Sequence, residues 1–504
     1  MSAITRSSTV DGILRRSARA FPERVALRFQ DREWTYAALD AAVSRAAAHL
    51  LSLGLEKGDR VAAFGKNSDA YLIGFIGCAR AGLVHVPLNY NLTGSELSYL
   101  LGQSGSRAVL VDPALATALD DVDGEAARGV EHRVPLRDTA DSLLAAASSG
   151  AVPQVEVEVV DTDLAQFLYT SGTTSRPKAA MMSHKALVHE YLSCLVALDL
   201  EADDNPLHVM PLYHSAQMHV FLMPWLAIGA TNTVLEVPDA GEILRRIEQD
   251  GHRAFFAAPT LWVAMTNHAD FASRDLDGLR KAYYGASIMP GPVLQRLQDK
   301  APAVGFYNCF GQSEVAPLTT VLRPEGHADR PDSAGRPVLF VEARVVDADG
   351  NDVGAGESGE IVYRSPQLCD GYWNDPVATE EAFRDGWFHS GDLVRVDDEG
   401  YVFVVDRIKD VINTGGVLVA SREVEDALYT HPAVAEVAVV GVPDEKWVEA
   451  VSAFVVRKAE VTADELTEHL RGRVASFKIP KRITFVEALP RNASGKILKR
   501  ELRA

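Results

Sequence analysis

The N-terminal part of the chain alternates between short apolar runs and segments with helical spacing. Arg60–Ala63 and Val84–Pro87 are apolar runs of strand length, and Ser68–Ala81 between them has its apolar residues at helical spacing. The same alternation recurs over Pro206–Leu235 and Phe255–Tyr284. Strands that alternate with helices predict parallel sheets covered by helices, and therefore an α/β fold.

Two other stretches complete the picture of this part. Residues 10–53 predict helices around a short hairpin, Val25–Trp34. The run Ala145–Gln154 is rich in alanine and serine and contains a glycine and a proline, so it predicts a surface loop.

The pattern changes after Gly335, where alternating strands without intervening helices predict a small β unit. Its strands are expected at Val341–Val346, Glu360–Tyr363 and Gly400–Val405. A last unit is expected from about Arg407, with helices and strands at Ser421–Thr430, Val434–Val442, Ala450–Val456 and Thr462–Val474. We therefore predict a large N-terminal domain over residues 1–406, with α/β sheets plus the small β unit, and a small α+β domain over residues 407–504.

Composition and charge disfavour several classes of function, among them nucleic-acid binding and membrane association. The 504 residues are 47% hydrophobic and 24% charged, an ordinary globular balance, and the formal net charge is −19. An acidic surface repels nucleic acid and anionic membranes, so neither is expected as a partner. The N-terminus has no apolar signal core and no apolar run is long enough to cross a bilayer, which favours a cytoplasmic protein. Its four cysteines lie too far apart in sequence for a zinc or redox motif.

The segment Tyr169–Ala180 is typical of a loop that holds phosphate. It carries five serine and threonine hydroxyls, the single Gly172, and Lys178 near its end. A Walker-type loop needs Gly-Lys followed by Ser or Thr, which is missing here, so a kinase or P-loop ATPase is disfavoured. A turn rich in hydroxyls and backbone amides and closed by a lysine still suits a polyphosphate. An ordinary Ser/Thr-rich surface turn is the alternative.

Four later motifs decide between these alternatives. Asn308–Glu314 ends in a carboxylate just beyond a predicted strand, and Trp387–Asp392 places Asp392 in a predicted glycine turn. Asp406–Asp410 lies where the last predicted unit begins, and Pro490–Ile497 carries Lys496. In this order, with the hydroxyl loop, they resemble the motifs of the adenylate-forming superfamily, which includes acyl-CoA synthetases, peptide-synthetase adenylation modules and firefly luciferase. The resemblance covers nearly the whole chain.

The resemblance implies an acid–thiol ligase that uses ATP and Mg²⁺. A carboxylate attacks the α-phosphate of ATP to give an acyl-adenylate and pyrophosphate, and a thiol such as coenzyme A then displaces AMP. Lys496, Glu314, Ser313 and Lys178 are the implied catalytic residues, with Glu314 as the magnesium ligand and Lys496 between the two reacting anions. The implied ATP-binding residues are Thr170, Ser171, Gly172, Thr173, Thr174, Lys178, Gly285, Ala286, Ser287, Asn308, Cys309, Phe310, Gly311, Ser313, Asp392, Arg407 and Lys496.

The resemblance also implies that the C-terminal domain is mobile and rotates between the two half-reactions. Lys409 is the implied hinge, and Gly415, Gly416 and Val417 form the implied coenzyme A turn. Relatives usually have Gly-Gly-Glu-Asn in this turn, whereas this chain has Val417 and Leu418 after the glycines. We expect this change to affect the thioester step more than adenylation.

The substrate acid is expected to be hydrophobic. By family position its pocket is lined by His214, Met218, Val220, Tyr283, Ala286, Gly311, Val315 and Ala316, and the stretch around His214 has no aspartate to hold an amino acid's ammonium group. Fatty, aryl and bulky polycyclic acids fit, and the motifs look most like those of bacterial fatty-acyl-type CoA synthetases. Two alternatives stay open: an enzyme that supplies acyl-adenylate to a carrier protein, and a non-catalytic member that only binds its ligands.

Overall fold

The computed structural model describes residues 6–170, 176–287, 289–415, 417–444, 447–491 and 497–503. These residues form two compact units. Unit 1 consists mainly of residues up to 170, Pro177–Glu342 and Arg364–Gly386, and unit 2 mainly of Ala343–Tyr363 and the described residues from Trp387 onward. Residues 387–406 thus group with the C-terminal part of the chain, and the boundary predicted after residue 406 stays a prediction.

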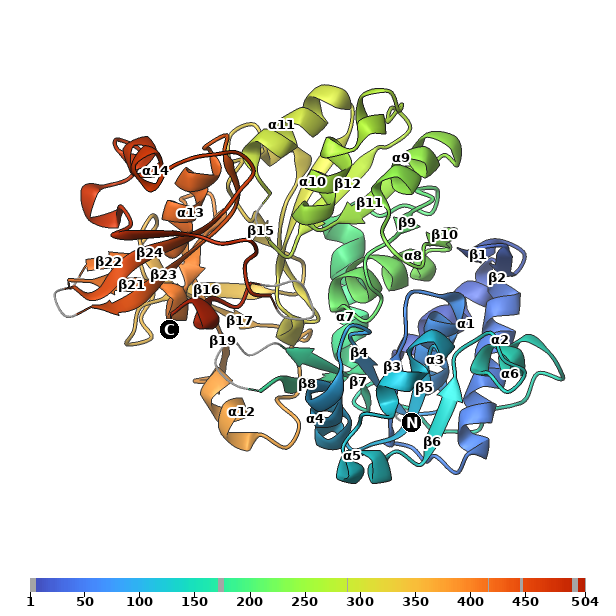
Figure 1. The fold of residues 1–504 in the computed structure, drawn as a ribbon. Helices are drawn as coiled ribbons and strands as arrows, with labels where there is room; N and C mark the ends of the chain where they lie inside the picture. Colours follow the sequence, from blue (N-terminus) through green and yellow to red (C-terminus); the bar gives the residue numbers. More distant parts are fainter. Residues whose placement is uncertain are drawn as a thin grey trace. The chain divides into compact units, whose positions relative to one another are not determined.

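Unit 1 contains a six-stranded sheet in the order β6-β5-β3-β4-β7-β8 (Figure 1). Its strands are parallel except for β8, which runs antiparallel to β7. The strands are β3 (Arg60–Phe64), β4 (Val84–Leu88), β5 (Ser106–Val111), β6 (His132–Pro135), β7 (Leu164–Thr170) and β8 (Lys178–Ser183).

A second, nine-stranded sheet of unit 1 has the order β15-β14-β13-β12-β11-β9-β10-β1-β2. Its central strands are parallel, and β2, β14 and β15 are antiparallel to their neighbours. The strands are β1 (Val25–Phe29), β2 (Arg32–Thr35), β9 (Leu207–His208), β10 (Asn232–Val234), β11 (Ala254–Ala257), β12 (Lys281–Gly285), β13 (Gly305–Gly311), β14 (Leu318–Leu322) and β15 (Arg336–Pro337).

Helices cover these sheets, and several begin at a side-chain cap. Thr9, Thr35, Ser68 and Ser183 each accept a hydrogen bond from a backbone amide of the first turn. The helices are α1 (Val10–Ala20), α2 (Tyr36–Ser52), α3 (Asp69–Arg80), α4 (Gly94–Ser104), α5 (Gly124–Gly129), α6 (Leu143–Ser148), α7 (His184–Ala197), α8 (Met223–Ala227), α9 (Ala240–Gln249), α10 (Pro259–Asn267), α11 (Gly291–Lys300) and α12 (Pro376–Ala382), and the short strand β18 is Phe383–Arg384.

Helix α3 is buried along its whole length, which explains why its sequence is apolar on every side. It packs against α2 (Figure 1). Both helices contribute to the largest apolar core, together with α1, α6 and α7. A second core gathers side chains of β9, α9, β11, α10, β12 and α11. Unit 1 thus contains two sheets covered by helices, as the strand–helix alternation predicts.

Unit 2 has two smaller sheets. In one, β16 (Glu342–Val346), β17 (Ser358–Arg364) and β19 (Trp387–Val396) are neighbours in that order, and β20 (Val402–Arg407) pairs with β19. The other has the order β22-β21-β24-β23, with β25 on β24, and carries helices α13 and α14. Its elements are β21 (Ile412–Thr414), β22 (Val417–Val419), α13 (Ser421–Tyr429), β23 (Val434–Asp444), β24 (Val448–Arg457), α14 (Ala463–Leu470) and β25 (Arg482–Phe485).

The α/β class with a smaller C-terminal α+β part is confirmed, but three local predictions were wrong. Leu143–Ser148 is helical, because Ser142 caps it and Leu143 and Leu144 are buried, so the predicted loop begins later. The last helix ends at Leu470 rather than at Val474. Asp392 lies inside the long strand β19, next to Gly391 with a φ of 71°, and not in a separate turn. No helix in the described ranges is long and apolar enough to cross a membrane.

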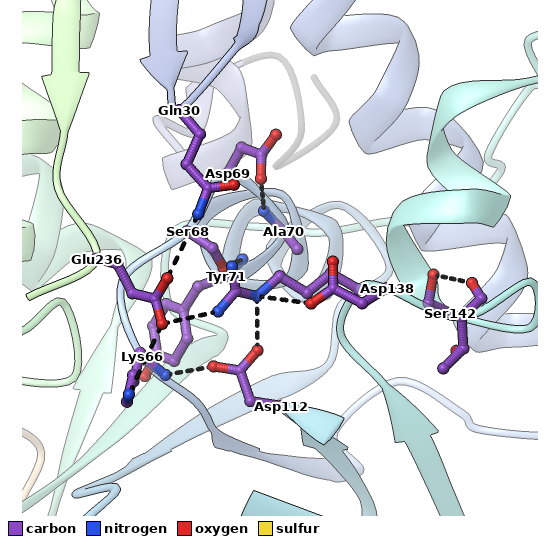
Figure 2. A network of polar contacts seen from close by, with 12 residues as sticks. Gln30, Lys66, Ser68, Asp69, Ala70, Tyr71, Asp112, Asp138, Ser142 and Glu236 are labelled. Atoms are coloured by element: carbon purple, nitrogen blue, oxygen red, sulfur yellow. Dashed lines mark hydrogen bonds and ion pairs between the residues drawn. The ribbon is translucent and has the colours of Figure 1, made fainter. Parts of the chain in front are cut away.

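A partly buried polar cluster joins the two sheets of unit 1. The guanidinium of Arg137, just after β6, binds Asp112 after β5 at 2.8 Å and Glu236 after β10 at 3.2 Å. Lys66 donates its backbone amide to Asp112 at 2.7 Å. Figure 2 shows Lys66, Asp112 and Glu236 in this cluster. Since β6 and β5 belong to one sheet and β10 to the other, Arg137 fixes the strand ends of the two sheets against each other.

Replacing Arg137 with alanine should lower the free energy of unfolding by about 3 kcal/mol or more, because buried Asp112 would lose its cation. Urea unfolding measures this. Arg28→Ala is the matched control, since the Arg28–Glu33 pair in the same unit is exposed and should be worth less than about 1 kcal/mol. Equal losses in the two variants would contradict the role assigned to the cluster.

A second buried polar chain runs through the largest core of unit 1. The amide of Gln166 donates to Nδ1 of His85 at 2.9 Å, and its oxygen accepts from Nε2 of His219 at 2.7 Å. Nδ1 of His219 in turn accepts from the hydroxyl of Tyr191 at 3.0 Å. Burial lowers the pKa of both His85 and His219 to about 3. This arrangement requires both imidazoles to be neutral.

Stability should therefore fall in mild acid. The unfolded chain takes up protons on these histidines below about pH 6.5, whereas the folded protein does so only near pH 3. This contribution to stability is complete above pH 6.5 and is lost as the pH falls towards 3. In unfolding measured between pH 6.5 and 4, His85→Leu should reduce the slope of stability against pH by about 1.4 kcal/mol per pH unit. An unchanged slope would show that His85 is already protonated in the folded protein.

Candidate active site

The hydroxyl loop connects two neighbouring strands of unit 1. Thr170, the last residue of β7, pairs with Lys178, the first residue of β8, in an antiparallel ladder. The loop therefore leaves and re-enters the sheet at adjacent positions. Ser171, Gly172, Thr173 and Thr174 lie outside the described residues, so their predicted contacts with phosphate stay predictions. Strand β8 itself was not predicted.

Lys178, Tyr372 and Glu314 come together beside this loop. The ammonium of Lys178 lies 5.2 Å from the centre of the Tyr372 ring, and the Tyr372 hydroxyl donates to Oε1 of Glu314 at 2.9 Å. Gly371 and Trp373, on either side of Tyr372, form backbone hydrogen bonds with β8. Burial and the neighbouring Glu314 carboxylate raise the pKa of Tyr372, which keeps its hydroxyl protonated as a donor. Tyr372 was missed by the sequence analysis, because nothing in its local pattern connects it with a carboxylate 58 residues away.

Glu314 fits the role of a magnesium ligand. It is 8% exposed and forms no ion pair with any cation of the described residues. Nowhere in the described ranges do three His, Cys, Asp or Glu side chains gather as a metal cage. Mg²⁺ commonly binds through one or two carboxylates together with substrate phosphates, and it prefers oxygen ligands. A single buried carboxylate beside a phosphate-type loop matches that kind of site.

The end of β13 is held close to its neighbours by two glycines. Gly285 on β12 pairs with Cys309 on β13, and a side chain at Gly285 would come within 2.1 Å of the Cys309 carbonyl oxygen. A side chain at Gly311 would come within 1.9 Å of the Pro317 carbonyl oxygen. Only glycine allows these close approaches. Ala286, directly after β12, has a φ of 65°, so the predicted opposite wall has a constrained backbone.

The other residues predicted to bind adenine or the α-phosphate lie on or near β13. Asn308 donates its side-chain amide to the Ser333 carbonyl at 2.9 Å, Cys309 is buried, and Phe310 is half-buried. The Ser313 hydroxyl lies 3.5 Å from that of Ser215. This contact brings the segment with Ser313 and Glu314 next to the one with His214. The predicted residues on these segments thus lie around the adjacent ends of β12 and β13: Gly285, Ala286, Asn308, Cys309, Phe310, Gly311, Ser313 and Glu314. Ser287 is exposed just beyond β12.

His214 is prepared to donate a hydrogen bond. Its Nδ1 accepts from the Ala216 amide at 3.3 Å, which leaves the proton of a neutral imidazole on Nε2. Desolvation lowers the pKa of His214, so the ring is neutral at pH 7. Asn67 holds the preceding loop, because its amide donates to the Met210 carbonyl at 3.0 Å and its oxygen accepts from the Leu212 amide at 2.7 Å. Asn67 was also missed by the sequence analysis.

The apolar residues predicted to line the acid pocket are deeply buried. Met218 and Val220 lie in η3 (Ala216–Leu222), a wide helical segment, and Val315 and Ala316 are fully buried. Tyr283 packs among aromatic rings and donates its hydroxyl to the Leu198 carbonyl at 2.9 Å. Its side chain therefore has a structural use, and its contact with the acid stays a prediction.

In unit 2, Asp392 and Arg407 face each other across two paired strands. They are partners in the β19–β20 ladder, and Nε of Arg407 lies 2.6 Å from Oδ1 of the buried Asp392. Ser390 supports this pair, since its hydroxyl accepts from the Asp392 amide at 3.0 Å. The sequence analysis named both residues but did not predict this ion pair.

The predicted hinge and thiol-side turn also lie in unit 2. Lys409 is exposed in η7 (Ile408–Asp410), and its carbonyl accepts from Arg503 at 3.1 Å. Strands β21 and β22 form a hairpin in which Gly415 donates its amide to the Trp447 carbonyl at 2.6 Å. Val417 and Leu418 on β22 are 46% and 68% exposed, which is unusual for two adjacent apolar side chains. Gly416 and Lys496 lie outside the described residues.

The fold and these residues define a class of two-part enzymes that bind a nucleotide. Residues 14–373 match the family described as "AMP-binding enzyme", and residues 423–496 match "AMP-binding enzyme C-terminal domain". The chain belongs to the AMP-binding enzyme family, as its motifs predicted.

Relatives and solved structures match over almost the whole chain. A feruloyl-CoA synthase of Amycolatopsis sp is 38% identical over 97% of this chain and 97% of its own length. A long-chain-fatty-acid–CoA ligase of Mycobacterium tuberculosis is 35% identical over 94% of this chain and 93% of its own. The crystal structure of an anthranilate CoA ligase in complex with anthranoyl-AMP is similar with a TM-score of 0.91 and 26% identity, covering 100% of this chain and 98% of that one. The acid–thiol ligase class predicted from the sequence agrees with these relatives.

Proposed function

We propose that this chain is an AMP-forming acyl-CoA ligase that activates a hydrophobic carboxylic acid with ATP and transfers it to coenzyme A. The observation that carries the proposal is the cluster of Glu314, Tyr372 and Lys178 beside the β7–β8 loop. It occurs in a chain that matches CoA ligases over nearly its full length. We also propose that the protein acts in the cytoplasm.

In the first half-reaction, residues 170–178 hold the β- and γ-phosphates of ATP, and Lys178 adds positive charge. Glu314 is the proposed ligand of Mg²⁺, which neutralises phosphate charge when it is bound. Asp392 accepts hydrogen bonds from the ribose, and Arg407 orients that carboxylate through the ion pair at 2.6 Å. Lys496 stabilises the charge that develops as the acid attacks the α-phosphate and pyrophosphate leaves.

The acid is proposed to lie between His214 and the buried apolar residues of η3 and Val315–Ala316. Nε2–H of His214 is available as a donor to a carboxylate, and Met218, Val220 and Val315, which are almost completely buried, make its surroundings apolar. Feruloyl-CoA synthase and the fatty-acyl ligase are both relatives, so aryl and fatty acids are the two classes to test first.

In the second half-reaction, the thiol of coenzyme A attacks the acyl carbonyl and AMP leaves. We propose that residues 407–504 move as a domain about Lys409 between the two steps and that the turn after Thr414 then borders the thiol substrate. Transfer to a carrier protein instead of coenzyme A is the second candidate. The thiol-side turn with Val417 and Leu418 is where the two acceptors would be distinguished.

A panel of aryl and fatty acids in a pyrophosphate-release assay tests the proposal. Lys496→Ala should lower acyl-adenylate formation on the order of 100- to 1000-fold, because one electrostatic group for the transition state is lost. It should still convert supplied acyl-adenylate to thioester. Lys458→Ala, at an exposed lysine of unit 2, is the control and should behave as wild type. Undiminished adenylation by the Lys496 variant would refute the assigned role.

The altered turn generates a separate prediction. The double variant Val417→Glu with Leu418→Asn restores polar side chains at two exposed positions and should speed coenzyme A consumption from supplied acyl-adenylate. Pyrophosphate release should not change, because these residues are assigned to the thiol step alone. If coenzyme A turnover is the same before and after the change, the apolar pair does not limit that step.

A further inference from the structure

The turn that carries Glu314 has a backbone that must be held in place. It follows β13 as η5 (Ser313–Val315), and Ala316 then has a φ of 70° before the chain enters β14. A residue with a side chain seldom adopts this conformation, and it persists only where the surroundings enforce it. A small shift of this turn would move the Glu314 carboxylate.

Glu190 on α7 holds the far side of this turn. It is fully buried, and its Oε1 accepts from the Leu318 amide at 3.0 Å and from the Cys194 thiol at 3.3 Å. Its Oε2 accepts from the side-chain amide of Gln367 at 2.6 Å. No cation of the described residues pairs with Glu190, so three weaker donors surround a carboxyl group that is costly to bury.

Gln367 is also fully buried and reaches the same turn directly. Its amide nitrogen lies 3.2 Å from the Leu318 carbonyl oxygen and 3.4 Å from that of Val315, and its own oxygen accepts from the Ser193 hydroxyl at 2.6 Å. Together, Glu190 and Gln367 bind backbone groups on both sides of Ala316.

The segment that carries Gln367 also holds Glu314 itself. Two residues after Gln367, the amide of Cys369 donates to the Glu314 carbonyl at 2.8 Å. Three residues further on, the Tyr372 hydroxyl donates to the Glu314 carboxylate at 2.9 Å. One short segment therefore fixes the backbone of the turn through Gln367 and the acidic side chain through Tyr372.

The free-energy cost of burying the Glu190 carboxyl group indicates that this residue has a role other than stabilising the fold. Burial raises the pKa of Glu190 well above its ordinary value, so this carboxyl group opposes folding when it is ionised. An apolar side chain of similar volume would often be neutral or stabilising at such a position. An apolar side chain, however, could not accept the Leu318 amide hydrogen bond that anchors the turn.

We propose that Glu190 and Gln367 are positioning residues for Glu314, which hold its turn so that the carboxylate is placed to bind magnesium with ATP. The inference rests on the proposed function of Glu314. Neither residue touches the reacting atoms, and both act through the backbone of residues 315–318.

The test measures magnesium-dependent ATP binding by calorimetry, independently of turnover. Glu190→Met and Gln367→Met should each raise the magnesium concentration for half-maximal ATP binding about 10-fold or more, as is usual when a ligand loses its supporting hydrogen bonds. Binding of ATP in the presence of a chelator should not change. Cys194→Ala is the matched control, because its thiol binds the same Glu190 oxygen without touching the turn, and it should keep the wild-type response.

The half-reactions supply a second measurement. The two variants should slow adenylation, with recovery at high magnesium, and should leave thioester formation from supplied acyl-adenylate unchanged. Folded variants with a wild-type magnesium response, or with equal losses in both half-reactions, would overturn the inference. If the Met variants do not fold, isosteric Glu190→Gln is judged by the same magnesium response. A wild-type protein that neither binds ATP with magnesium nor forms acyl-adenylate would instead refute the proposed function.

Discussion

A buried carboxylate without a cation partner among the described residues is the constraint on which unit 1 depends. Glu314 is mostly removed from water, and its one described side-chain hydrogen bond comes from the Tyr372 hydroxyl. A negative charge that is removed from water is costly unless a positive charge lies close to it. In the proposed function, a metal bound with a polyphosphate would supply that charge and would neutralise both the carboxylate and the phosphates.

This constraint explains why so much of unit 1 converges on one turn. The two glycines at the strand ends, Gly285 and Gly311, allow the backbones of β12, β13 and the turn to approach closely. Tyr372 and the amide of Cys369 then fix Glu314 from the segment that runs beside β8. Because the same segment contacts Lys178 and β8, it connects the acidic turn with the strand that follows the hydroxyl loop. Segments that are far apart in the sequence thus meet around Glu314.

The sequence allowed the fold class and the motif residues to be predicted, because both leave local patterns. The strand–helix alternation predicted β3, α3 and β4, and the motif around Glu314 predicted a carboxylate just after a strand, where η5 begins. Tyr372, Gln367 and Glu190 could not be found in this way. Their roles arise from hydrogen bonds between residues that are 49 to 177 positions apart, and no local pattern records such pairs.

Tertiary contacts explain two of the local predictions that were wrong. Leu143 and Leu144 face a core that a short Ala/Ser-rich window does not reveal, so a helix forms where a loop was expected. Asp392 was assigned to a turn because glycine precedes it, yet its pairing with Arg407 requires an extended strand. In both cases a tertiary contact overrides a local preference. The same holds for Ala316, whose left-handed backbone opposes its own preference and which lies between peptide groups that Glu190 and Gln367 bind. A strained position that depends on buried polar partners can be placed accurately only by the whole fold, and the magnesium-binding role proposed for Glu314 requires that accuracy.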